Sequence, residues 1–369
     1  MKKSYLFVGA ILVIAVILGV FLGLEKNEPK IKIGFVGPLS GDMAVFGVPS
    51  KIAVEEAAEK MGYKINGVPF EIIYEDGKCS SSGGSEAYNK LIQVDDVDYI
   101  IGGLCSPEVL SGAAIAESTE TIHISYCASA PKVRTAGDYS FVLFPLDELE
   151  TKVSAEYIYG TLGVRKVAII YTLNDWGEGE KTGFISSFEK LGGTIVSVEG
   201  TAKDEISFKT VLQKAADSKP ELIYAAQFPG PTENTLKDAQ QLGIKIPLYI
   251  PQMLTPETIK SLGSATNGAY TIKAEAKISD EELIKTVTKK TEGMAIDSLC
   301  YGWAYDSLFM LKTAIESIDS FDPEKVKSEL YSMSYKGILG DHKFDADGIL
   351  DRASFGIYKV DGEKLVKIN

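Results

Sequence analysis

The stretch IKIGFVGPLSGDMAVFG, residues 31–47, decides the fold class of this chain. It begins with an apolar run, Ile31–Val36, which is followed by small polar residues, by Phe46 and by the start of a helical pattern. In α/β sheets, ligands bind where the carboxyl ends of parallel strands open into such turns. The stretch therefore predicts a strand whose end lies at a binding crevice.

Short β-branched runs alternate with amphipathic segments along the following residues. Strands are predicted over 70–74, 99–101 and 122–125. A helix is predicted over 49–61, where the apolar positions share one face, Pro49 lies near the start and Gly62 follows the end. This β-α-β order is typical of a parallel sheet covered by helices.

The same order begins again after Leu146, which predicts a second lobe. A helix is expected over 149–162, followed by strands over 167–171, 194–198, 222–226 and 248–250. A long helix is expected over 296–318, and the tail from Gly337 is interpreted as two strands joined by a turn.

Three crossings of the chain between the lobes are expected, near Phe144, Lys273 and Phe344, and these segments would act as a hinge. The first lobe would then comprise residues 31–145 plus 274–343. The second lobe would comprise residues 146–273 plus 344–369.

The composition limits the kind of partner. With 369 residues, 45% of them hydrophobic and 24% charged, the chain is long enough for two substantial cores. A net charge of −13 disfavours nucleic acid and anionic membrane surfaces. We therefore expect a monomer that binds a small molecule.

The N-terminal segment is predicted to hold the chain at a membrane. Tyr5–Leu24 is a run of 20 residues without a charge, preceded by Lys2 and Lys3. Such a run is long enough to cross a bilayer, and the lysines favour a cytoplasmic N-terminus. We expect residues 1–30 to form an uncleaved anchor and a polar tether, with a processed leader as the alternative. The body would lie outside the cytoplasm, on the cell membrane.

Four cysteines suit an exported chain, in which disulfides can form. Cys79 and Cys105 lie in polar, turn-rich segments that can face each other, although sequence alone does not fix the pairing. Cys127 and Cys300 have apolar neighbours and are expected to be packed thiols. No C-x-x-C or His-rich spacing exists, so no metal site is expected.

Polar residues follow several of the predicted strands. Ser106 precedes Pro107, which predicts a helix start; its hydroxyl either binds a carboxylate or only caps the helix. Ser129 lies in a segment of small residues and is either a second hydroxyl donor or part of an ordinary loop. Gln252 can both donate and accept hydrogen bonds. An apolar wall is expected from Trp176, Tyr224 and Phe228.

The loops of common enzyme classes are missing. There is no G-x-G-x-x-G, no G-x-x-x-x-G-K-[ST] and no G-x-S-x-G. The two histidines, His123 and His342, have no obvious nucleophile beside them. We therefore expect no enzyme activity, no catalytic residue and no cofactor. An enzyme with an unrecognised site and a sensing domain of a signalling system remain as alternatives.

Taken in order, several motifs resemble the branched-chain (Leu/Ile/Val) receptors of ABC importers, which have the type I periplasmic-binding-protein fold. The resemblance extends from Ile31 to the C-terminus. It implies two doubly wound parallel-sheet lobes that close on a solute and present it to a permease in the membrane. The motifs are GPLSGDMAVFG, YEDGKC, YIIGGLCS, ISYCASAP, VAIIYTLNDWGEGE and GILGDHKFDADG.

The resemblance also implies roles for particular residues. Cys79 and Cys105 would form the disulfide of the family. The α-carboxylate of the ligand would be held by Ser106, Ala128 and Ser129, partly through main-chain groups. Aromatic positions at the cleft match Phe46, Trp176 and Phe228, and pocket-lining positions match Cys127 and Cys300.

Gln252 departs from the pattern of the family. It falls where amino-acid-binding members carry a glutamate that pairs with the ammonium group of the ligand. Because charge-assisted hydrogen bonds are roughly twice as strong as neutral ones, the amide weakens this contact unless another acid enters the cleft. Branched-chain or related amino acids are the first expected ligands. Neutral amides and aromatic or aliphatic carboxylates are the alternative.

Overall fold

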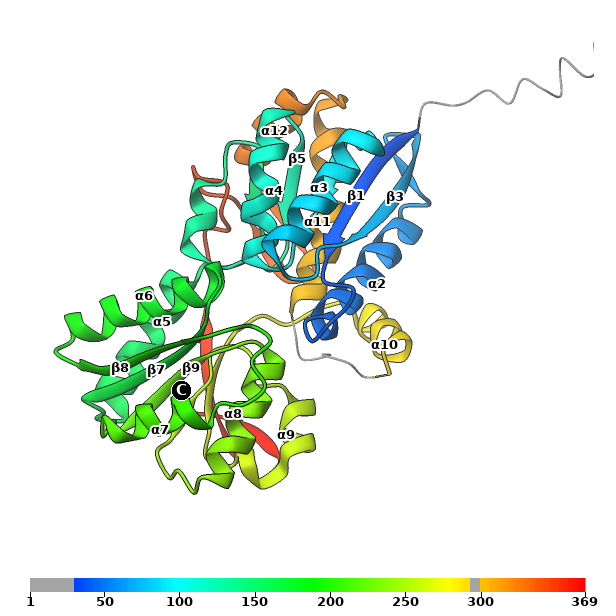
Figure 1. Cartoon of the computed structure of the whole chain (residues 1–369). Helices are drawn as coiled ribbons and strands as arrows, with labels where there is room; N and C mark the ends of the chain where they lie inside the picture. The colour runs from blue at the N-terminus through cyan, green and yellow to red at the C-terminus, as the bar shows by residue number, and fades with distance from the viewer. Residues whose placement is uncertain (1–29, 293–298, 369) are drawn as a thin grey trace, which may run out of the picture.

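The computed structural model describes residues 30–292 and 299–368, which form two lobes (Figure 1). One lobe is built on a six-stranded sheet and the other on a seven-stranded sheet, which confirms the predicted α/β class. The expected anchor, Tyr5–Leu24, lies outside the described residues. Within them, no helix combines the length and the apolar character needed to span a bilayer.

The first sheet has the strand order β2-β3-β1-β4-β5-β6. Its strands are parallel except for β2, which runs antiparallel to β3. In the middle of the sheet, Ile33 of β1 lies opposite Ile72 of β3 and Tyr99 of β4. All four strands predicted for this lobe are confirmed. The strands are β1 Ile31–Gly37, β2 Lys64–Ile65, β3 Val68–Asp76, β4 Tyr99–Ile101, β5 Ile122–Ser125 and β6 Ser140–Val142.

Helices cover both faces of this sheet. Ile33 and Phe35 of β1 belong to the core beneath α2 and α11, whereas Val36 packs with Tyr88 and Ile100 in a separate core beneath α3 and α4. The helices are α2 Ala44–Lys60, α3 Ser81–Asn89, η1 Lys90–Val94, α4 Ser106–Ser118, η2 Pro131–Thr135, α10 Glu281–Lys290, α11 Cys300–Ile318 and α12 Pro323–Ser332.

Helix α2 begins at Ala44, five residues before the predicted start at Pro49. The N–H groups of Phe46 and Gly47 bond to the carbonyl oxygen of Met43 at 3.0 and 3.2 Å, so a turn forms ahead of the proline. Pro49 then lies in the second turn, where its missing N–H removes one hydrogen bond. The proline therefore does not mark the helix start, as the pattern suggested.

The second sheet has the order β15-β14-β11-β10-β9-β7-β8. Strands β7 to β11 are parallel, whereas β14 runs antiparallel to β11 and β15. All four strands predicted for this lobe are confirmed, and the tail forms a hairpin of β12 and β13 in addition to β14 and β15. The bounds are β7 Lys166–Thr172, β8 Thr194–Thr201, β9 Leu222–Ala226, β10 Leu248–Tyr249, β11 Tyr270–Ala274, β12 Tyr335–Gly337, β13 Gly340–His342, β14 Phe355–Asp361 and β15 Lys364–Lys367.

Helices α5 and α6 pack side by side in the second lobe (Figure 1). The predicted helix over 149–162 begins two residues earlier, at Asp147, and continues into a π-helical turn. The helices of this lobe are α5 Asp147–Glu156, η3 Tyr157–Thr161, α6 Asp175–Lys190, α7 Lys209–Asp217, α8 Pro229–Gln241, α9 Pro256–Leu262 and η4 Gly263–Thr266.

The chain passes between the two lobes three times: between β6 and α5, between β11 and α10, and between β13 and β14. In Figure 1 the last crossing is visible as the red strand that enters the green lobe. Phe144 lies in the first crossing segment, Lys273 near the end of β11, and Phe344 at the beginning of the third.

Candidate functional site

A cleft lies between the two lobes, where the carboxyl ends of strands from both sheets meet. Loops that follow parallel strands gather at one edge of a sheet, which explains why sequence-distant residues meet here. The first lobe contributes Met43, Phe46, Leu104, Cys105, Ser106, Cys127, Ser129, Phe144, Leu299, Cys300 and Trp303, and the second contributes Trp176, Phe228, Gln252, Met253, Thr255, Lys273 and Ala274.

Seven of the eight candidate ligand residues line this cleft, namely Phe46, Ser106, Ser129, Trp176, Phe228, Gln252 and Cys300. Ala128, between Cys127 and Ser129, is buried and is not among the lining residues, and its N–H donates to the hydroxyl oxygen of Ser125 at 3.4 Å. Tyr224 also lies outside the cleft, because its ring is stacked between Phe184 and Tyr249 in the core of the second lobe. The expectation that Tyr224 forms a cleft wall was therefore wrong.

Ser106 connects two loops of the first lobe. Cys105 is the N-cap of α4 and Ser106 is its first residue. The Ser106 hydroxyl oxygen accepts hydrogen bonds from the N–H groups of Ala130 at 3.0 Å and Ser129 at 3.3 Å. Because a hydroxyl has two acceptor sites and one proton, Ser106 has only its proton left to offer. That proton, at the start of a helix, suits an anionic acceptor.

Glu108 and a disulfide fix the loop that carries Ser106. The fully buried Glu108 carboxylate accepts hydrogen bonds from the N–H groups of Cys79, Leu104 and Cys105 at 2.9, 3.1 and 3.0 Å. Cys79 and Cys105 are joined by a disulfide with a Cα–Cα distance of 5.3 Å, as the resemblance implied. The polar end of the cleft is therefore rigidly supported.

Cys127 and Cys300 form a second disulfide, with a Cα–Cα distance of 5.4 Å, so the expectation of two packed thiols was wrong. The two residues are 173 positions apart in the chain. Apolar neighbours suit a packed thiol and a paired cysteine equally well, which is why the local sequence did not distinguish them. This disulfide joins the loop after β5 to the first turn of α11.

Two aromatic pairs form apolar walls of the cleft. Trp176 and Phe228 are stacked, with ring centroids 5.2 Å apart, and Phe144 meets Trp303 edge-on at 4.8 Å. Both indole N–H groups are buried without an acceptor among the described residues. A solute in the cleft would therefore meet flat apolar surfaces and polar groups at few points.

The polar side chains that the second lobe contributes to the cleft are those of Gln252, Thr255 and Lys273. Gln252 has a backbone φ of 57°, a left-handed conformation that is uncommon for residues other than glycine and often occurs at functional sites. Its Nε2 donates a hydrogen bond to Glu150. Over residues 30–292 and 299–368, no Asp or Glu lines the cleft.

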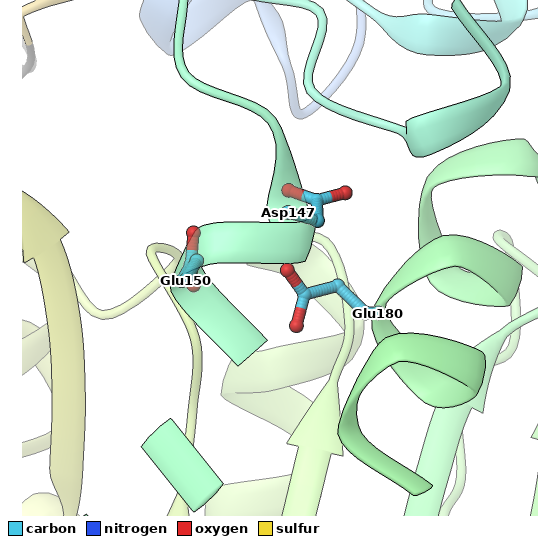
Figure 2. A group of neighbouring side chains, drawn as sticks. All are labelled: Asp147, Glu150 and Glu180. Atoms are coloured by element: carbon cyan, nitrogen blue, oxygen red, sulfur yellow. The ribbon is translucent and has the colours of Figure 1, made fainter. Parts of the chain in front are cut away.

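Three buried acids, Asp147, Glu150 and Glu180, lie behind Gln252, and Figure 2 shows their side chains converging from α5 and α6. They are fully buried, and one oxygen of each lies within 4.8 Å of the others. Burial raises the pKa of Asp147 to about 7. Burial, and then the nearby acids, raise the pKa values of Glu150 and Glu180 well above the usual range. Glu150 and Glu180 therefore retain their protons at neutral pH, whereas Asp147 is only partly protonated, and a metal ion would have to displace these protons.

These acids and Lys273 were missed by sequence reasoning. Asp147, Glu150 and Glu180 belong to helices that also carry exposed acids, such as Glu148 and Glu178, so the residue type carries no signal of burial. The one signal for Lys273 was its expected place at a crossing between the lobes.

Two parallel-sheet lobes that are joined by three segments and enclose a cleft define the class of type I periplasmic binding proteins. A family model described as "Periplasmic binding protein" matches residues 30–364. The chain belongs to this family.

Curated relatives cover nearly the whole chain. The Leu/Ile/Val-binding protein of Citrobacter freundii is 23% identical over 337 residues, which are 89% of this chain and 90% of the relative. The leucine-, isoleucine-, valine-, threonine-, and alanine-binding protein of Pseudomonas aeruginosa is also 23% identical and covers 92% of both chains.

Solved structures show the same fold. A leucine-binding protein from Thermotoga maritima has a TM-score of 0.83 at 22% identity, covering 92% of this chain and 98% of that chain. A solute-binding protein of an ABC transporter from R. palustris, in complex with benzoate, has a TM-score of 0.82 at 20% identity, covering 92% and 96%.

Proposed function

We propose that this protein is the extracytoplasmic solute-binding receptor of an ABC importer, and that it delivers a branched-chain or related amino acid to a permease. The observation that carries the proposal is the cleft itself. Its first-lobe end offers the proton of Ser106, and its walls are aromatic. The names of the curated relatives support the same ligand class.

Binding follows from this arrangement. The carboxylate of the solute accepts the Ser106 proton at the start of α4, while the apolar side chain lies against Trp176 and Phe228. Because both lobes contribute walls, a bound solute makes more contacts when the lobes are together than apart. The solute therefore shifts the population toward the closed form, which the permease recognises.

An aromatic carboxylate is the second candidate solute. No acid among the described residues lines the cleft to pair with an ammonium group, and the stacked Trp176 and Phe228 suit a flat ring. The R. palustris neighbour was solved with benzoate.

We further propose that the receptor is tethered to the membrane. Tyr5–Leu24 anchors the chain in the cell membrane, and the two lobes act outside the cytoplasm as a monomer. The cleft binds its solute without chemical conversion.

Calorimetric titration of the full-length chain with leucine, isoleucine, valine, benzoate and 4-hydroxybenzoate tests the proposal. We expect saturable binding of at least one branched-chain amino acid, together with a decrease in the radius of gyration measured by X-ray scattering. Binding of benzoates alone would select the second candidate. Consumption of any solute during the titration would contradict a pure binding function.

A further inference from the structure

Gln252 connects the buried acids to the cleft by a hydrogen bond. Gln252 lines the cleft, whereas Asp147, Glu150 and Glu180 do not. The side-chain Nε2 of Gln252 donates to Oε2 of Glu150. Oε1 of Glu150 has no hydrogen-bond donor among the described residues other than a proton held within the group of acids, whereas the Asp147 carboxyl also interacts with the side chains of Ser129 and Gln252.

The group of acids presents acceptors at its edges. Glu180 accepts a hydrogen bond from the hydroxyl of Tyr224 through its Oε2, just as Glu150 accepts one from Gln252. The oxygens that face one another have only shared protons to satisfy them, because buried carboxyls this close do not all ionise. Oε2 of Glu150 is therefore held as an acceptor.

This acceptor determines which way round the Gln252 amide lies. An amide carries its donors on one arm and its acceptor on the other. Since the nitrogen arm is bound to Glu150, the oxygen arm is left for a solute in the cleft. The left-handed backbone of Gln252 further restricts how the side chain can be placed.

We infer that Glu150 is a positioning residue for solute selection, because it holds the Gln252 oxygen toward the cleft and so favours solutes with a hydrogen-bond donor at that point. This inference rests on the proposed receptor function and narrows its ligand class. An ammonium group or a hydroxyl satisfies the oxygen, whereas a keto oxygen or a bare methylene leaves it without a donor.

Four solutes of one shape test the inference by calorimetric titration of the full-length chain. Leucine and 2-hydroxy-4-methylpentanoate carry a donor beside the carboxylate, whereas 4-methyl-2-oxopentanoate and 4-methylpentanoate do not. We expect each donor-bearing solute to bind at least about tenfold more tightly than the other two. Tighter binding of the keto acid or of benzoate would overturn the inference and leave the receptor function standing. Binding of none of them would overturn both.

Variants of Glu150 show whether this residue orients the Gln252 amide or only fills space in the core. In Glu150→Met the acceptor is lost. We therefore expect the ratio of the affinities for donor-bearing and donor-free solutes to fall toward one. In Glu150→Gln the new amide can still accept from Gln252 while donating to its acidic neighbours, so the preference should largely return. Glu148→Met and Glu148→Gln are the matched controls, since Glu148 is exposed on the same helix. An unchanged preference in Glu150→Met would overturn the inference.

A double variant shows whether Glu150→Met acts through Gln252 or only through lost packing. If Glu150 acts through Gln252, adding Glu150→Met to Gln252→Leu should not change the preference any further. A further change in the preference would contradict this route. If Glu150→Met does not fold, a crystal structure of the wild-type chain with leucine decides, and an ammonium group far from the Gln252 oxygen would overturn the inference.

Discussion

The Ser106 hydroxyl shows how one side chain can have a role that its sequence position leaves open. Its place before a proline allowed both a helix cap and a ligand contact. In the structure its oxygen accepts hydrogen bonds from the main-chain N–H groups of Ser129 and Ala130, in the loop after β5, and it does not cap α4. Its proton is left for a solute. A sequence cannot reveal this division, because it depends on the distance between two loops.

Ser106→Ala removes this proton and also the acceptor for the N–H groups of Ser129 and Ala130. Because hydrogen bonds to charged groups contribute roughly 1.5 to 3 kcal/mol, we expect ten- to a hundredfold weaker binding of carboxylate solutes. Calorimetric titration measures the change. Ser118→Ala, at the exposed end of the same helix, is the control. Affinity equal to that of the wild type would show that the hydroxyl serves the loops alone.

Asp147 makes the stability of the protein depend on pH. Burial raises its pKa from 3.8 to about 7, so between these values the folded state holds a proton that the unfolded state has released. Stability therefore falls as pH rises through this range, by up to about 4 kcal/mol. In Asp147→Asn this contribution is absent.

Urea unfolding at pH 4 to 8 measures the effect. The stability of Asp147→Asn relative to the wild type should increase as pH rises from about 4 to 7. Glu156→Gln, at the exposed end of the same helix, is the control. A difference between Asp147→Asn and the wild type that does not vary with pH would contradict the assignment.

At the scale of the element, periodicity and turn residues predicted most strands. They did not predict features that depend on contacts between residues distant in sequence. The strands Tyr99–Ile101 and Ile122–Ser125 match their predictions, because apolar runs between turns are short-range signals. Six of the candidate residues that line the cleft follow predicted strands, whereas Cys300 lies in a predicted helix and was suggested by the resemblance alone. The buried acids and the pairing of Cys127 with Cys300 were not predicted, because each depends on neighbours distant in sequence.

The two disulfides should differ in their contribution to stability. In the chain-entropy model, closing the 173-residue separation of Cys127 and Cys300 contributes about 5 kcal/mol, and the 26-residue separation of Cys79 and Cys105 contributes about 3.5 kcal/mol. We therefore expect the double serine variant at 127 and 300 to have the lower melting temperature. Thermal unfolding of the two double variants makes the comparison. The reverse order would mean that native-state strain outweighs chain entropy.

At the scale of the whole molecule, the lobes meet beside the cleft where α6 packs on α4 and η2, and where exposed polar groups pair. Lys132 of the first lobe forms an ion pair with Asp175 of the second at 3.2 Å. The N–H of Gly230 lies 3.4 Å from the carboxylate of Asp42. Because exposed ion pairs contribute little, we expect solute contacts to add to the free energy that holds the lobes together.

Gly179 of α6 tests whether closure is required for binding. A Cβ at this position would lie 2.8 Å from Cδ of Pro131 in the first lobe, so a larger side chain keeps the lobes apart. We expect Gly179→Leu to bind solute roughly tenfold more weakly, since the bound solute loses contacts with one lobe. X-ray scattering should also show a larger radius of gyration with solute present. Gly160→Leu is the control, because a Cβ at Gly160 meets no atom within 4 Å. Wild-type affinity in Gly179→Leu would show that solute binds without closure.

Three of the four paired cysteines, Cys105, Cys127 and Cys300, line the cleft. The pocket therefore matures by thiol oxidation, and four cysteines permit three pairings of which one is native. A host that secretes the chain through a compartment with a disulfide isomerase should yield active receptor. Overproduction in a reducing cytosol should instead yield soluble polypeptide that cannot retain its solute.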